Sequence, residues 1–184
     1  MRAADLDILF VPGLGGSGPD HWQSRWEEKL STAKRVEQDD WSRLAVEPWR
    51  QRLVQRVAKA RRPVVLVAHS AGVAAVAHAA AHFPPGVVRG AFLVAPPSRR
   101  AMQELAACEA DFADVPDAPL PFPALLVASQ TDPYSSFTEA EAFAAAWGAE
   151  LADAGDSGHI NADSGHGPWP EGLMRFAGFL KQLG

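Results

Sequence analysis

The sequence contains almost no cysteine, no long hydrophobic run and no excess of positive charge. Its 184 residues include a single cysteine, Cys108, so no internal disulfide can form, as is typical of proteins in a reducing compartment. No apolar stretch approaches the about 18 residues of a membrane helix, and the apolar run near the N-terminus is too short for a signal-peptide core. We therefore expect a cytoplasmic protein that does not bind membranes.

The charge balance argues against nucleic acid as a partner. The formal net charge is −5 and no basic stripe is visible along the chain. Hydrophobic residues make up 47% and charged residues 21%, as in ordinary globular proteins. The length predicts one domain over residues 1–184, which can bury roughly 70% of its unfolded surface without a disulfide or a metal.

Short apolar runs alternate with helical patterns along the whole chain. Continuous apolar runs are typical of strands that are buried on both faces of a parallel sheet. We expect strands at Ile8–Val11, Lys34–Gln38, Val64–Ala68, Val87–Ala95, Ala124–Ser129 and Ala149–Ala152. We expect helices at Asp20–Leu30 (with Asp20 as the cap), Pro48–Ala60, Ala71–Phe83, Phe137–Trp147 and Leu173–Leu183. The pattern predicts a doubly wound α/β sheet, whose sites gather at the carboxyl ends of the strands.

A nucleophile motif follows the most strongly apolar of these runs. Ala68-His69-Ser70-Ala71-Gly72 resembles the G-x-S-x-G elbow, in which a serine lies on a strained turn between strand and helix. Such a turn needs small residues two positions before and after the serine, and Ala68 and Gly72 meet that need. We expect His69 to point away from the nucleophile. The alternative is that Ser70 is a plain helix N-cap.

Two further strand ends carry an acid and a base. Asp132 follows the run Ala124–Ser129, although an Asx-turn before proline would also explain it. His159 and His166 lie in the loop after the last apolar run, and His166 is a competitor for the role of base. The order Ser70, Asp132, His159 is the order in α/β-hydrolases.

The glycine-rich loop after the first apolar run allows two interpretations. A hydrolase takes one oxyanion-hole amide from this loop and the other from the residue after the nucleophile, here Leu14 and Ala71. The same loop matches G-x-G-x-x-G at Gly13, Gly15 and Gly18, as in dinucleotide-binding domains. The capping residue Asp20 would delay the helix past these glycines, which argues against the dinucleotide alternative.

Tryptophan is abundant in this chain, which has six. Trp22 and Trp26 are spaced for one face of a helix, so packing against the sheet explains them. Trp41 and Trp169 fall in loops, and we expect them, together with His21, to border the substrate pocket. Replacing Trp169 by alanine should then change substrate preference more than stability.

Four segments resemble a known family. PGLGGSGPDHWQSRWE, AHSAG, SQTDPYSSF and GHINADSGHGPWPEG are similar to the small serine hydrolase family that contains bacterial YdeN and mammalian retinoblastoma-binding protein 9. The resemblance implies a compact α/β-hydrolase of six parallel strands without a large lid. It implies Ser70 as nucleophile, Asp132 as acid and His159 as base, because the family base lies in a Gly-His pair after the last strand. Ala68 departs from the common glycine of the elbow.

These observations predict a serine hydrolase that cleaves small carboxylic esters through an acyl-enzyme on Ser70. Thioesters and small amides use the same chemistry. The mechanism requires no metal or organic cofactor, and His78 and His82 have no evident third ligand. The main alternative is a protein-binding module on a hydrolase scaffold with little catalysis, although nothing in the sequence indicates a protein partner.

Overall fold

The computed structural model describes all 184 residues and contains one six-stranded sheet in which all strands are parallel. The strand order is β2-β1-β3-β4-β5-β6. The strands are β1 Asp7–Val11, β2 Ala33–Arg35, β3 Val64–His69, β4 Val88–Val94, β5 Ala124–Ala128 and β6 Glu150–Asp153. The predicted α/β class and the six parallel strands are confirmed. The apolar runs are explained by the burial of these strands on both faces of the sheet.

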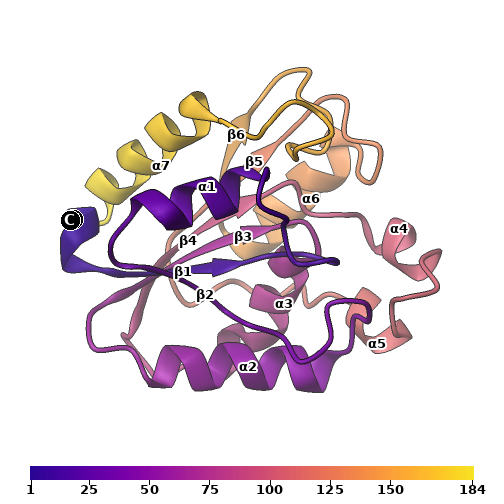
Figure 1. Ribbon diagram of the computed structural model, residues 1–184. Coiled ribbons are helices and arrows are strands. Elements are labelled where there is room, and N and C mark those ends of the chain that lie inside the picture. The colour runs from indigo at the N-terminus through magenta and orange to yellow at the C-terminus, as the bar shows by residue number, and fades with distance from the viewer.

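Helices cover both faces of the sheet, as Figure 1 shows, with α1 and α7 on one side and α2 and α3 on the other. The helices are α1 Trp22–Lys29, α2 Val46–Ala58, α3 Ala71–Ala79, α4 Arg99–Gln103, α5 Ala110–Ala113, α6 Phe137–Trp147 and α7 Pro170–Gln182, with short 3₁₀ turns η1 Ala3–Asp5 and η2 Ala80–His82. None of these helices is long and apolar enough to cross a bilayer.

Each central strand contributes to two hydrophobic cores. In β1, Leu9 belongs to a cluster of 33 buried residues with α2, α3 and α6, whereas Phe10 belongs to a cluster of 18 with α1 and α7. In β3, Leu66 and Val67 divide in the same way. This alternation follows from the two-residue period of a strand, and it explains why the runs contain no polar interruption.

The structure corrects several element boundaries. His21, and not Asp20, caps α1, because its Nδ1 accepts the N–H of Gln23. The carboxylate of Asp20 instead pairs with Arg25 at 3.1 Å. Strand β2 ends at Arg35, the last of its residues that pairs with β1, and does not extend to residue 38. No sequence pattern indicated α4 or α5, which have only 5 and 4 residues.

Candidate active site

The turn between β3 and α3 holds Ser70 in a strained conformation. Its φ of 56° and ψ of −130° lie outside the ordinary regions for a residue with a side chain. Gly72 is essential to this turn, because a Cβ there would lie 2.1 Å from the carbonyl oxygen of Val11. The chain therefore forms a sharp strand-turn-helix elbow, and the plain N-cap alternative fails because the Ser70 side chain makes no cap hydrogen bond.

Three side chains from different strand ends form one hydrogen-bonded chain. The Ser70 hydroxyl lies 2.9 Å from Nε2 of His159, and Nδ1 of His159 lies 3.0 Å from both carboxylate oxygens of Asp132. A carboxylate only accepts, so Nδ1 carries the proton and Nε2 is free to accept the hydroxyl proton. The side chains of His159 and Asp132 are only 9% and 3% exposed, which strengthens their interaction.

The loops that carry Asp132 and His159 are joined to each other. Ser129 at the end of β5 accepts the N–H of Ser157 at 3.0 Å and donates to the carbonyl of Gly155 at 3.1 Å. Thr131 accepts the N–H of Gly158 at 3.1 Å. These contacts hold the Asp132 and His159 loops in a fixed relation to each other.

The competing histidine, His166, takes no part in this chain. Its Nδ1 lies 3.1 Å from the Ser164 hydroxyl, within its own loop. Partial burial lowers the pKa of His166 below the ordinary value. Of the two histidines in this loop, His159 alone reaches both Ser70 and Asp132.

The glycine-rich loop approaches the elbow closely. A Cβ on Gly13 would lie 3.0 Å from that of Ser70 and 3.1 Å from the Ala71 nitrogen, so backbone alone fits there. Gly15 and Gly16 donate their amides to Trp41 and Gly13, whereas the amides of Leu14 and Ala71 donate to no protein group. Helix α1 begins only at Trp22, after all three glycines of the dinucleotide motif, so that alternative is wrong.

A cavity of about 290 Å³ opens in front of Ser70. Its apolar lining includes residues that no sequence pattern indicated, namely Leu44, Pro97, Ala101, Met102 and Leu105. Its polar lining residues include Ser17, His21, His69, His159 and Asn161, and Tyr134 lines it as well. Leu14 and Tyr134 remain exposed at 39% and 51%, which leaves the entrance open to solvent.

Of the three predicted pocket residues, His21 alone lines the cavity. Trp169 is 5% exposed and stacks on Trp26 within the core beneath α1 and α7, so its assignment to the pocket was wrong. Trp41 packs against the edge of Trp49 and the glycine loop, and it also lies outside the cavity. Loop position alone therefore did not indicate access to substrate.

His21 is a buried, neutral hydrogen-bond donor. Burial is the main cause that lowers its pKa to about 4, and the charge of Arg35 lowers it further. Since Nδ1 accepts the cap hydrogen bond, the neutral ring carries its proton on Nε2. That nitrogen is buried and has no protein partner, and the ring lines the cavity.

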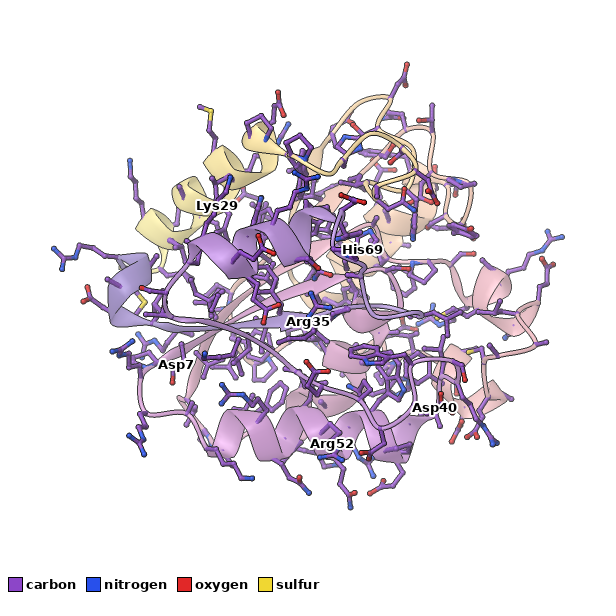
Figure 2. All side chains as sticks on the ribbon, in the orientation of Figure 1. Asp7, Lys29, Arg35, Asp40, Arg52 and His69 are labelled. Atoms are coloured by element: carbon purple, nitrogen blue, oxygen red, sulfur yellow. The ribbon has the colours of Figure 1, made fainter.

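The His69 ring does not bond to Ser70 but contacts His159, which the sequence did not indicate. Figure 2 shows His69 in the interior near the start of α1, and its ring makes no hydrogen bond with Ser70. Its Nε2 instead lies 2.9 Å from the carbonyl oxygen of His159, and the two rings lie 4.9 Å apart. Burial holds the pKa of His69 well below the ordinary value, so the ring is neutral.

Residues 8–178 match the family model of serine hydrolases. The chain belongs to the serine hydrolase family. A YdeN-like hydrolase from Pectobacterium atrosepticum, known from its crystal structure, is 36% identical to this serine hydrolase. The match covers 98% of this chain and 94% of that chain, with a TM-score of 0.87. Comparison with curated protein sequences finds no match.

Two more distant structures share the fold of this serine hydrolase. The ydeN gene product of B. subtilis is 18% identical, with 95% of this chain and 98% of that chain covered and a TM-score of 0.76. The propionate-bound esterase Est2 of Thermogutta terrifontis is 17% identical, with 100% and 86% covered and a TM-score of 0.69. At these identities the likeness concerns the arrangement of strands and helices.

Proposed function

We propose that this serine hydrolase cleaves small carboxylic esters through an acyl-enzyme on Ser70. The observation that carries the proposal is the hydrogen-bonded chain from Ser70 through His159 to Asp132. A serine hydroxyl becomes a nucleophile when an adjacent base accepts its proton and a third group orients that base. The left-handed backbone of Ser70 adds support, since strain of this kind concentrates at functional sites.

In the proposed mechanism Ser70 Oγ attacks the ester carbonyl carbon while His159 Nε2 takes its proton. The unpartnered amides of Leu14 and Ala71 donate to the oxyanion of the tetrahedral intermediate. His159 then gives the proton to the departing alkoxide, and the acyl group stays on Ser70. Water, deprotonated by His159, releases the acid and restores the serine. Each step uses groups of this chain and water, and none needs a cofactor.

The shape of the cavity favours a small substrate. A space of about 290 Å³ holds a short acyl chain with a modest alcohol. We assign the acyl group to the apolar lining residues Leu44, Met102 and Leu105, since these side chains offer no polar partner. Thioesters and small amides fit the same geometry and form a second group of test substrates.

Hydrolysis of a series of p-nitrophenyl esters tests the proposal. We expect acetate and butyrate esters to be cleaved faster than octanoate, and Ser70→Ala to abolish the activity. Asp132→Asn keeps the shape but favours the wrong His159 tautomer, so kcat should fall about 10⁴-fold. A folded wild-type protein that cleaves no ester, thioester or amide would contradict the proposal and favour a protein-binding role instead.

A further inference from the structure

The segment that carries His159 has an unusual backbone. Gly158 has a φ of +53° and Ile160 a φ of +47°, so the residues on both sides of His159 are left-handed. Glycine adopts this conformation freely, but a β-branched residue there is an outlier that costs about 1–3 kcal/mol. Such a conformation persists only where surrounding contacts force it, and Ile160 is fully buried at 0% exposure.

Two buried ring nitrogens form hydrogen bonds with the backbone carbonyls of this segment. His69 Nε2 lies 2.9 Å from the carbonyl oxygen of His159, and Trp22 Nε1 donates to the carbonyl of Ile160 at 2.9 Å. The His69 ring is neutral and faces a carbonyl, which only accepts, so Nε2 is the donor. Consecutive carbonyls of one strained segment are thus held by donors from β3 and α1.

We propose that His69 and Trp22 are positioning residues that fix the backbone of His159 so that its imidazole meets both Ser70 and Asp132. The inference rests on the proposed hydrolase function. His69 is the neighbour of Ser70 in the chain, so its hydrogen bond ties the base directly to the nucleophile turn. Trp22 is the first residue of α1 and is 0% exposed, so its hydrogen bond joins the His159 segment to this helix.

The two donors matter because the imidazole cannot correct a misplaced backbone. Its two nitrogens are committed to different partners at 2.9 and 3.0 Å, so a rotation that restores one hydrogen bond loses the other. Displacement of catalytic groups by about 1 Å costs on the order of 100-fold in rate. Loss of the Trp22 donor, which is not among the residues that line the cavity, should therefore lower kcat and leave substrate binding nearly unchanged.

The first experiment compares Trp22→Phe with Trp26→Phe in the full chain. Both tryptophans are buried in the same aromatic cluster, with ring centroids 4.7 Å apart, but only the Trp22 indole donates to the His159 segment. For p-nitrophenyl acetate we expect Trp22→Phe to lower kcat about 10- to 100-fold with KM within about twofold. Trp26→Phe should stay within about threefold of wild type in kcat.

His69→Gln and His69→Leu form the second matched pair. Glutamine keeps an N–H that can reach the His159 carbonyl, and leucine has none. Because His69 also lines the cavity, the two variants are compared in kcat at saturating substrate. We expect His69→Gln to retain most of the wild-type kcat and His69→Leu to lose it. Equal losses in the two His69 variants, or equal losses in the Trp22 and Trp26 variants, would overturn the positioning role.

A readout independent of catalysis separates this inference from the proposed function. The proton on His159 Nδ1, held between the ring and Asp132, gives a downfield proton resonance when the ring is fixed. We expect the resonance to persist in Trp26→Phe and to broaden or disappear in Trp22→Phe. An inert wild type would contradict the hydrolase function alone, whereas an unchanged resonance in Trp22→Phe would contradict the positioning role.

Discussion

At the scale of single residues, the elbow depends on a missing side chain. A Cβ at position 72 would approach the carbonyl oxygens of Val11 and Pro12 to 2.1 and 2.7 Å, and backbone cannot yield easily there. We expect Gly72→Ala to lower the free energy of unfolding by about 3 kcal/mol, the upper end for an overpacked site. Urea unfolding at neutral pH measures the change.

Gly178 provides the control for that substitution. It lies on the exposed side of α7, and a Cβ there would meet no atom within 4 Å. Gly178→Ala should raise the free energy of unfolding by about 0.5–1 kcal/mol, because alanine favours the helix. Similar effects at both positions would show that the close approach at Gly72 is not what constrains the turn.

His21 links stability to pH. The pKa of His21 is about 4 in the folded protein, because of burial and the charges of Arg35, His159 and His166, against an ordinary value of 6.5. Between pH 6.5 and 4 the unfolded chain binds a proton at this residue that the folded chain does not. The free energy of unfolding should therefore decrease as the pH is lowered from 6.5 towards 4, by about 1.4 kcal/mol per pH unit from this group.

The variant His21→Asn isolates that contribution. Asparagine can still cap α1 by accepting the Gln23 N–H, but it does not titrate. Its free energy of unfolding should vary less steeply than that of wild type between pH 6.5 and 4, with a residual slope from buried His69. Parallel wild-type and variant curves in urea unfolding across this range would contradict the buried, neutral state of His21.

At the scale of elements, α1 and α7 are joined to the sheet by an aromatic cluster. Trp169 stacks on Trp26 with an interplanar angle of 15° and contacts Trp22 and Phe92 edge-on or tilted. We expect Trp169→Ala to lower the free energy of unfolding by about 3–5 kcal/mol and to leave the order of ester preference unchanged. This reverses the expectation drawn from the loop position of Trp169.

Leu105, just after α4, should behave in the opposite way. It lines the cavity and is 38% exposed, so Leu105→Ala removes apolar contact with the acyl chain but little core packing. We expect its free energy of unfolding to stay within about 0.5 kcal/mol of wild type and KM for the butyrate ester to rise. A stability loss as large as that of Trp169→Ala would place Leu105 in the core.

At the scale of the whole molecule, the sequence predicted the fold and the order of the three candidate catalytic residues. Strands such as Val64–His69 were recognisable because burial on both faces demands an unbroken apolar run. Ser70, Asp132 and His159 were recognisable because parallel strands bring their carboxyl ends to one edge. Their convergence in space follows from the topology that the apolar runs already implied.

The walls of the cavity were not predictable in the same way. Met102 and Leu105 belong to the region of α4, whose 5 residues are too few to show a helical period. Leu44 faces the cavity because it pairs with Cys108 in an isolated bridge between distant loops, which no local pattern reveals. The hydrogen bonds from His69 and Trp22 to the His159 segment likewise depend on tertiary contacts alone.

The most direct test of an assembled nucleophile is labelling with a fluorophosphonate probe, which reacts with activated serines. We expect folded wild-type protein to gain one label, which peptide mass spectrometry locates on Ser70, and we expect no label in Ser70→Ala or His159→Ala. A folded wild type that stays unlabelled, or a Ser70→Ala variant that labels as fast as wild type, would contradict the assignment of Ser70 as the nucleophile.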